Sequence, residues 1–374
     1  MKTTFVNSID KIDELTWQSL TDAGSPFIHY QFFNALENSQ SVCSEKGWQP
    51  HHLLCSKYNQ IHAIVPLYIK QHSWGEYVFD WAWADAYQQH NEAYYPKLVA
   101  TVPFTPISTT KLITNDIELS QVFSMLTEHC LAQNINSWHI LYAQESHKQS
   151  LLLNNVFQRN TVQFHWFNRQ YHDFDDFLSS FTARKRKNVK KERLSILQQN
   201  IKTRRILGKD ITPQELDFFY LTYQLTYLKR QHSPHLTADF FARLLKSLPN
   251  NILLVIASLE GRDIACAWFF FDEHQLYGRY WGCTQRCNNL HFELCYYQGI
   301  EFCIEHKLQV FNPGAQGEHK IQRGFEPVLT HSYHWIKHPE FRPAIQKFCQ
   351  QEQQQMQRYF EHCQQFLPFK TETG

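Results

Sequence analysis

Short apolar runs bounded by polar turns are the strongest local signal in this chain, and they predict strands. Two such pairs of runs, at residues 52–56 with 63–70 and 253–258 with 264–271, each enclose a polar turn. A third run at 275–282 follows the second pair. Amphipathic spacing with helix-start signals predicts helices in other segments. These lie at 26–39, 117–133, 173–181, 183–193, 213–230, 237–248, 290–306 and 339–366.

The two halves of the chain repeat one order of elements. Each half has a strand, a turn, a second strand and a Trp-bearing third segment, placed at 77–81 in the first half and at 275–282 in the second. A helix then leads each half to a Pro-containing segment, at 102–106 and 310–315. Residues 94–97 are predicted to open a helix, and 102–106 resemble a strand broken by prolines, which is allowed only at sheet edges or bulges. We read this as a duplicated α/β unit, antiparallel first and parallel after the helix crossover. The expected domains are 1–168 and 169–338, followed by a C-terminal helix and tail at 339–374.

Composition excludes several classes of protein. Lys plus Arg number 36 and Asp plus Glu number 35, so overall charge favours neither nucleic acid nor membrane, and any basic patch must be local. No segment reads as a signal peptide or as a stretch of 18 apolar residues, which predicts a cytoplasmic protein with no stable membrane insertion. The ten cysteines form no C-x-x-C pair, which favours reduced core residues over disulfides or zinc.

Residues 312–325 have the composition of a functional site. Three glycines (Gly314, Gly317 and Gly324) stand among Glu318, His319, Lys320 and Arg323, directly after a predicted strand. Closely spaced glycines indicate positive φ angles or a close backbone approach. A hairpin carrying solvated charges is the alternative explanation.

A second candidate stretch, residues 72–87, combines acids with tryptophans. If 77–81 is a strand, its acids cluster near the strand ends beside the aromatic rings. Two interpretations stay open, a substrate cleft and an aromatic core whose acids reach solvent or cap the next helix. The residues concerned are Glu76, Asp80, Asp85, Trp81, Trp83 and Tyr87.

The one strong charge run covers residues 183–193, with seven cations and one anion. A solvated helix face is the ordinary explanation of such a run, and contact with phosphate or RNA is the alternative. The contact residues would be Arg184, Lys187 and Lys191.

Several longer motifs resemble a known family. Residues 66–87, 94–97, 103–106 and 313–325 are similar to the FemAB-like proteins of the GNAT superfamily, a bacterial family described as acting in peptidoglycan biosynthesis or recognition. The resemblance covers nearly the whole chain. It implies an α/β (α+β) fold of two tandem GNAT-like domains with mixed sheets, and an acyl or aminoacyl transfer reaction.

The chain departs from acetyl-CoA-dependent GNAT enzymes at one place. Those enzymes resemble one another in a glycine-rich loop whose backbone amides hold a pyrophosphate. The corresponding residues here are Arg279-Tyr-Trp-Gly-Cys-Thr284, an incomplete form of that pattern. This puts acyl-CoA in doubt as the donor and favours aminoacyl-tRNA, whose phosphates the basic run would meet.

Transfer to an amine needs a base and groups that stabilise an oxyanion. We expect Glu318 or His319 as the base, and Lys320 or Arg323 with backbone amides as anion stabilisers. The acceptor would be a small-molecule or peptide amine. Besides the acids and rings of 76–87, the expected substrate-binding residues are Arg279, Trp281, His291, Glu293 and Gln316.

Other interpretations remain. Glu318 can instead form a structural salt bridge with Lys320 or Arg323, and His319 can simply orient its loop. The whole protein can be a non-catalytic module that recognises peptidoglycan-precursor-like peptides through Trp81, Trp83 and Asp85. Metal-dependent hydrolysis through His319, His331, His334 and Glu318 is disfavoured, because no metal-ligand spacing stands out. The oligomeric state stays open.

A duplicated unit also predicts where the candidates meet. Loops after corresponding strands should face the domain interface, where small-molecule sites tend to form. We therefore expect residues 316–323 and 76–85 to line one shared cleft, and substitution of Asp80 or Glu318 to cost activity with little change in melting temperature.

Overall fold

A computed structural model describes residues 2–21, 24–114, 117, 119–144, 156–315 and 317–370. The chain divides into two compact units, and each is considered separately. Unit 1 comprises residues 1–161 and 329–358, and unit 2 comprises 162–328 and 359–374. The sequence placed the boundary after residue 168 and did not foresee that 329–358 return to the first unit.

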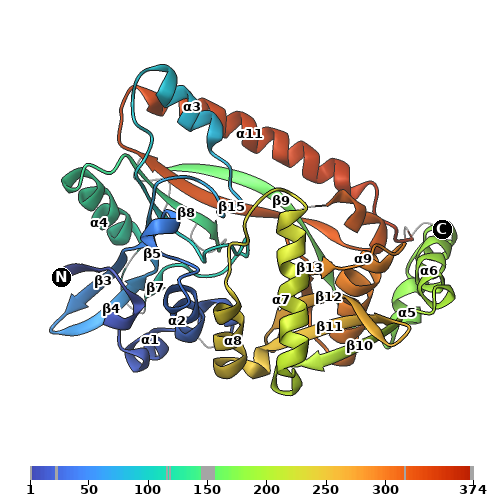
Figure 1. Cartoon of the computed structure of the whole chain (residues 1–374). Coiled ribbons are helices and arrows are strands. Elements are labelled where there is room, and N and C mark those ends of the chain that lie inside the picture. Colours follow the sequence, from blue (N-terminus) through green and yellow to red (C-terminus); the bar gives the residue numbers. More distant parts are fainter. Residues whose placement is uncertain are drawn as a thin grey trace. The chain divides into compact units, whose positions relative to one another are not determined.

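Within its described residues, unit 1 contains strands of two sheets, the helices α1 to α4 and most of helix α11 (Figure 1). Its elements are β1 (Lys2–Val6), α1 (Glu14–Leu20), α2 (Tyr30–Asn38), β2 (Trp48–Pro50), β3 (His52–Lys57), β4 (Gln60–Val65), β5 (Leu67–Lys70), α3 (Trp81–Gln89), β6 (Lys97–Ala100), β7 (Ile113–Thr114), α4 (Leu119–Ala132) and β8 (Ser137–Ala143). Three further elements, β9 (Phe157–Phe167), β15 (Glu326–Ile336) and α11 (Phe341–Gln364), have residues in both units.

The predicted second strand of unit 1 is split at Pro66. Proline cannot donate to a strand ladder, and here β4 ends before it and β5 begins after it. β4 pairs in the sheet ordered β1-β3-β4-β7, whereas β5 pairs with β2 and β6 in another sheet. That second sheet continues through β8, which runs parallel to β6, because α4 carries the chain back across.

Three sequence predictions for unit 1 are wrong. Residues 77–81 form no strand, residues 94–97 open no helix, and residues 102–106 form no strand. The alternation Trp-Ala-Trp-Ala at 81–84 suggests a period of two, but α3 forms there because three alanines favour a helix and Trp83 and Tyr87, four residues apart, bury one face. A cis Tyr95–Pro96 peptide bond leads instead into β6.

Unit 2 is built on the sheet β10-β11-β12-β13-β14-β9. Its elements are α5 (Phe174–Ser179), α6 (Ala183–Gln198), β10 (Lys202–Leu207), α7 (Pro213–Leu228), α8 (Ala238–Ser247), β11 (Ile252–Leu259), β12 (Arg262–Phe271), β13 (Gln275–Cys283), α9 (Leu290–Phe292), the π-helical turn η7 (Glu293–Tyr297), α10 (Gln298–Glu305), β14 (Val310–Asn312) and the 3-10 helix η8 (Glu318–Arg323). β10 to β13 are antiparallel, and β13 pairs parallel to β14 across the α9–α10 crossover.

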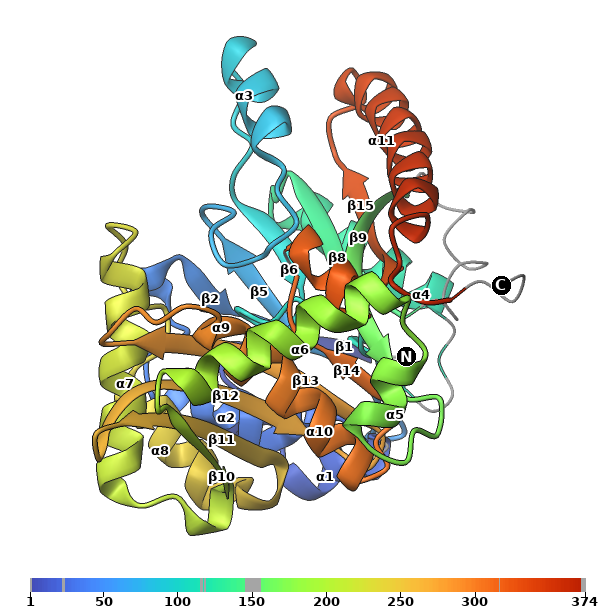
Figure 2. The ribbon, with the colours of Figure 1, turned by 90° about the vertical axis from the view of Figure 1, so that its right-hand side faces the viewer.

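Both faces of the unit 2 sheet are covered, which explains why its strands are continuous apolar runs. Leu253 and Val255 face the core that includes α10, α5 and α6. On the other face Trp268 packs against Phe219 of α7 and Phe241 of α8, with ring centroids 4.6 and 5.4 Å away. Figure 2 shows α7 and α8 on one side of these strands, and α6, α9 and α10 on the other. The antiparallel-then-parallel order is confirmed for unit 2. In unit 1 the predicted third strand and the Pro-containing segment form no strands, and the parallel pair is β6 with β8.

Candidate functional site

The turn after β14 positions the charged residues of the first candidate stretch. Gly314, Gly317 and Gly324 have φ angles of +94°, +117° and +87°, as closely spaced glycines predicted. Between the last two, η8 turns the chain so that Lys320 points inward while Glu318 and His319 stay exposed. Gln316 lies outside the described residues.

Lys320 is deeply buried in this turn, since only 1% of the residue is exposed to solvent. Its Nζ donates one hydrogen bond, to the Gly314 carbonyl at 2.7 Å. Burial lowers the pKa of Lys320 to about 7, the cation of Arg279 adds to this, and Cys295 opposes it. Near neutral pH the amine is therefore partly uncharged, so it can accept a proton as well as donate a hydrogen bond.

Two imidazoles accompany Lys320. His319 Nε2 lies 2.7 Å from the Tyr296 hydroxyl, and the His291 ring lies 5.3 Å from the Tyr296 ring and 6.1 Å from that of His319. Burial lowers the pKa of His291 to about 4, reinforced by the positive field of His319 and Lys320. Burial also lowers the pKa of His319. Both rings are therefore neutral at pH 7 and able to take part in proton transfer.

Arg323 closes the turn from the other side. Its Nε and Nη2 donate to Glu192 at 3.1 and 2.6 Å, and its Nη1 donates to the His319 carbonyl at 2.6 Å. The guanidinium carbon lies 3.4 Å from the centroid of the Phe292 ring. Glu318 accepts a hydrogen bond from Tyr359 at 2.6 Å, so its partner is neither of the two cations proposed as salt-bridge partners.

The remaining unit 2 candidates divide into two groups. Trp281 packs its ring 5.3 Å from His291, and Arg279 acts on Lys320 electrostatically, so both belong to the same neighbourhood. Glu293 faces elsewhere and pairs with Arg193 of α6 at 3.0 Å, a contact that holds two helical segments together. The structure thus brings together His319, Lys320, Arg279, Trp281 and His291.

Residues 279–284 do not form a phosphate-binding loop, because most of them lie in strand β13. A Cβ added at Gly282 would lie 2.1 Å from the Thr222 carbonyl oxygen, so this glycine permits a close approach of α7. The Thr284 amide donates to the Ile264 carbonyl at 2.8 Å and is already used. These groups offer no set of backbone amides for a pyrophosphate.

In unit 1 the acids of the second stretch are buried around a lysine. Lys97 Nζ donates to Glu76 at 2.7 Å, to Asp80 at 2.6 Å and to Ser73 at 2.7 Å, and Tyr94 donates to Asp80 at 2.5 Å. Burial raises the pKa of Glu76 to about 7 against the pull of Lys97. Burial also pushes the pKa of Asp80 upward, but Lys97 outweighs it and holds that pKa below its usual range.

The rings and the third acid of this stretch point in different directions. Trp83 and Tyr87 are buried under α11, where Tyr87 stacks on Phe341 with centroids 3.9 Å apart. Asp85 lies on the exposed face of α3. Trp81 packs against Trp74, and Trp74 is 51% exposed. Each of the two interpretations left open therefore fits only part of this stretch. The core includes Glu76, Asp80, Trp83 and Tyr87, whereas Trp81 and Asp85 are accessible.

Sequence reasoning missed two residues at the centre of these clusters, Lys97 and Glu192, and each had a signal. Lys97 belongs to the quoted motif 94–97, but it was assigned to a helix start and not connected with the acids. Glu192 is the one anion of the basic run, and it pairs with Arg323. A single acid among seven cations indicates a specific partner elsewhere in the fold.

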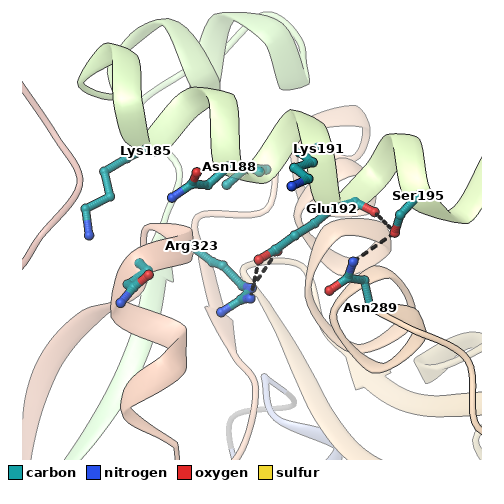
Figure 3. Close-up of a pocket in the computed structure, with 9 residues that line it drawn as sticks. Lys185, Asn188, Lys191, Glu192, Ser195, Asn289 and Arg323 are labelled. Atoms are coloured by element: carbon teal, nitrogen blue, oxygen red, sulfur yellow. Dashed lines mark hydrogen bonds and ion pairs between the residues drawn. The ribbon is translucent and has the colours of Figure 1, made fainter.

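The basic run forms helix α6, and its side chains point to two sides. Val189 and Ile196 are buried, Arg193 pairs with Glu293 and Glu301, and Lys190 pairs with Asp175. Beside the buried face lies a cavity of about 240 Å³ in unit 2 (Figure 3). It is lined by Lys185, Asn188, Val189, Lys191, Glu192, Ser195, Asn289, Gln322 and Arg323.

The described residues offer no group of three or more His, Cys, Asp or Glu side chains arranged to hold a metal ion. Two histidines of the metal hypothesis have other partners. His334 Nδ1 lies 2.6 Å from His139 Nδ1, and His331 Nδ1 lies 2.9 Å from Asn160. Over the same described residues, no helix has the length and apolar character needed to cross a membrane.

Comparison with known proteins places the chain in a family. The FemAB-like family model, described as peptidoglycan biosynthesis/recognition, matches residues 8–371, so the chain belongs to the FemAB-like family. No curated protein matches it significantly.

Solved structures share the fold at low sequence identity. A conserved protein of unknown function from Bacteroides thetaiotaomicron has a TM-score of 0.54 at 10% identity, covering 90% of this chain and 100% of that one. The C-terminal domain of a proposed lysylphosphatidylglycerol synthetase from Agrobacterium fabrum has 0.54 at 6% identity, with 92% and 97% covered. FemX has 0.53 at 10% identity, with 92% and 100% covered. The fold is α/β, with two tandem GNAT-like domains and mixed sheets.

Proposed function

We propose that this protein transfers an acyl or aminoacyl group to an amine acceptor, with its reaction centre at Lys320 in unit 2. The observation that carries the proposal is the Lys320 amine, which is buried, donates to the Gly314 carbonyl and lies beside the neutral rings of His319 and His291. Membership of the FemAB-like family supports a transferase, and the fold is shared with FemX and with a lysylphosphatidylglycerol synthetase domain.

The proposed roles follow from the chemistry of the groups. When the acceptor amine attacks the donor carbonyl, a C–N amide bond forms and the acyl–oxygen bond of the donor ester breaks. The carbonyl oxygen gains charge on the way, the amine loses a proton, and the departing donor hydroxyl takes one up. In this proposal His319, which is exposed and hydrogen-bonded to Tyr296, takes the proton of the amine. Protonated Lys320 and Arg279 supply positive charge for the oxyanion, and Glu318 remains a second candidate for the base.

For the donor we propose aminoacyl-tRNA over acyl-CoA. Residues 279–283 lie in strand β13 with Gly282 packed against α7, and the Thr284 amide donates to Ile264, so the segment lacks the glycine-rich loop that holds a pyrophosphate in acyl-CoA-dependent enzymes. Arg184, Lys187 and Lys191 are exposed on α6, and within the described chain none of the three forms an ion pair with a carboxylate. Such cations can meet the phosphates of an RNA.

The test is donor turnover in the presence of an amine acceptor. Purified protein is incubated with a lysine-containing peptide and either mixed aminoacyl-tRNA or acetyl-CoA, and the labelled acyl group on the peptide is counted. We expect Lys320→Met and His319→Asn to reduce transfer at least 100-fold, within the range of about 10²–10⁴ typical of acid-base groups. Lys209→Met, an exposed change in the same unit, is the control and should keep wild-type turnover.

A non-catalytic recognition module is the second candidate, favoured by exposed aromatic rings in unit 1. Trp74 is 51% and Phe79 45% exposed, and the ring of each packs against Trp81. Glu318→Gln separates the two functions. An enzyme that uses Glu318 loses turnover and keeps its ligand, whereas the module has no turnover to lose and retains binding.

A further inference from the structure

The cavity beneath α6 has the charge and the donors of an anion site. Three of its lining residues are cations, Lys185, Lys191 and Arg323, and one is an anion, Glu192. Three positive charges against one negative give the cavity a net positive field. Asn188 and Gln322 are exposed in its wall and can donate through their amide groups. The volume of about 240 Å³ can hold a phosphate group with part of the molecule that carries it.

The two lysines of the cavity are not used by the protein itself. Within the described part of the chain, neither Lys185 nor Lys191 forms an ion pair with a carboxylate, whereas Lys190 and Arg193 of the same helix are paired. Figure 3 shows Lys185 and Glu192 reaching from α6 toward the side where Arg323 lies. Six residues of an α-helix span about 9 Å, so the two lysines, with the guanidinium between the helix and the turn, can contact different oxygens of a phosphate-bearing ligand such as a pyrophosphate.

Arg323 already binds a carboxylate in the manner in which guanidinium groups bind phosphate. Its bidentate contact with Glu192, at 3.1 and 2.6 Å, is a fork geometry that matches either anion. The same guanidinium donates through Nη1 to the carbonyl of His319. An anion entering the cavity therefore meets a residue that also fixes the turn carrying His319 and Lys320.

We infer that this cavity is a discrete binding site for a phosphate group carried by an organic ligand, held by Lys185 and Lys191 with Arg323 at its floor. Glu192 offsets part of the charge of Arg323 through their bidentate contact and so opposes an entering anion. The ligand class deepens the proposed function, because a phosphate-bearing donor would occupy it, but phosphate binding itself needs no transfer activity. Two sources share this chemistry, a terminal pyrophosphate or phosphate of a small molecule and the phosphodiester of an RNA.

Isothermal titration calorimetry with inorganic pyrophosphate and with a short single-stranded RNA tests the site. The pocket variant is Lys185→Ala/Lys191→Ala. The matched control is Lys202→Ala/Lys209→Ala, which removes the same charge from exposed residues of unit 2 that lie outside the cavity. For wild-type protein we expect saturable one-to-one binding of at least one probe, weaker at higher salt.

The pocket variant should weaken that binding at least tenfold, which corresponds to about 1.4 kcal/mol. The control should stay within about twofold of wild type for pyrophosphate. Pocket-dependent binding of pyrophosphate supports a terminal phosphate, and pocket-dependent binding of RNA alone supports a phosphodiester. Equal weakening by both double variants, or no binding of either probe, would overturn the site.

A third variant, Glu192→Gln, tests the site independently. Removing the carboxylate raises the net positive charge, so affinity for the bound probe should increase at least threefold if Glu192 faces the anion. Unchanged or weaker binding in a folded Glu192→Gln protein, judged by its circular dichroism spectrum, would also count against the site. A protein that binds pyrophosphate in this pattern yet transfers no acyl group would refute the proposed function and leave this inference intact.

Discussion

At the scale of single residues, burial decides what the candidate groups can do. Lys320 was predicted as a fixed cation that stabilises an anion. Its burial instead moves its pKa into the physiological range, which makes its charge dependent on pH. The sequence carries no sign of this, because burial of one lysine depends on the whole packing around it.

Lys320→Met should make stability less dependent on pH. The folded pKa of Lys320 is about 7 and its ordinary value is 10.5, so between these values the unfolded chain binds the proton that the folded chain has lost. The free energy of unfolding of the wild type therefore rises with pH across that window and levels off below about 7. The variant should lack this rise and be more stable at pH 6, by more than about 1 kcal/mol, the equivalent of one pKa unit.

Urea unfolding at pH 6, 7.5 and 9 measures this effect. Lys70, another buried lysine whose pKa burial lowers to about 6, is present in both proteins, so its contribution cancels in the difference. Parallel stability curves for wild type and variant would show that Lys320 is solvated in solution.

The two aspartates of the tryptophan-rich stretch should respond differently to substitution. Asp80→Asn leaves Lys97 buried with one fewer charged partner and should cost about 3–5 kcal/mol of stability, as breaking a buried pair does. Asp85→Asn, on the exposed face of α3, should stay within about 0.5 kcal/mol. This replaces the expectation that changing Asp80 would spare the melting temperature. Thermal unfolding of both variants decides it, and equal small shifts would mean that Asp80 is not paired.

At the scale of elements, strands with a strong apolar pattern could be predicted and segments decided by tertiary contacts could not. The runs that became β11 and β12 are apolar and mostly buried, short and bounded by polar turn residues, and these features together indicate strands. β13 continues the same pattern with partly buried residues. For residues 81–89, the sequence pattern alone does not distinguish a strand from a helix. The burial of Trp83 and Tyr87 under α11, some 250 residues later in the chain, favours the helix there.

The glycine of β13 offers a test of helix-to-strand packing. Gly282→Ala would place a Cβ 2.1 Å from the Thr222 carbonyl oxygen, and backbone atoms cannot move aside cheaply. We expect a loss of about 1–3 kcal/mol, as overpacked cores show. Gly24→Ala is the control, since a Cβ there meets nothing within 4 Å. If the midpoints of chemical denaturation coincide for the two variants, α7 does not approach β13 as closely as described.

At the scale of the whole molecule, a net charge of +1 conceals the local positive charge of helix α6, where residues 183–193 carry seven cations and one anion.

The candidate site, like the fold, could be predicted only where it depends on residues that are close in sequence. Residues close in sequence, such as those of 318–323, were found together, but their partners Tyr296, Glu192 and Tyr359 come from other elements.

The expectation that 316–323 and 76–85 share one cleft stays a prediction. A crystal structure that separates them by more than about 20 Å would end it.

Binding of tRNA should depend on salt through the exposed face of α6. Replacing Arg184, Lys187 and Lys191 together by Ala should reduce the slope of log affinity against log salt concentration by about three, because each lost phosphate contact removes about one unit. Filter binding at several salt concentrations measures the slope. If the triple variant keeps the wild-type slope, this face of the helix is solvated and does not contact RNA.

The contact between α7 and β13 also bears on motion. Besides Thr222 against Gly282, Thr226 donates to the Trp281 carbonyl at 2.8 Å and Lys229 to the Cys283 carbonyl at 3.0 Å. Three successive turns of the helix are thus fixed to one strand edge, so the helix cannot slide or tilt without breaking all three contacts. In hydrogen-deuterium exchange, the amides of these turns and of residues 280–283 should exchange together, as one cooperative unit. Any rearrangement that accompanies ligand binding would then carry α7 and β13 as one rigid piece and be taken up in the segments that flank them.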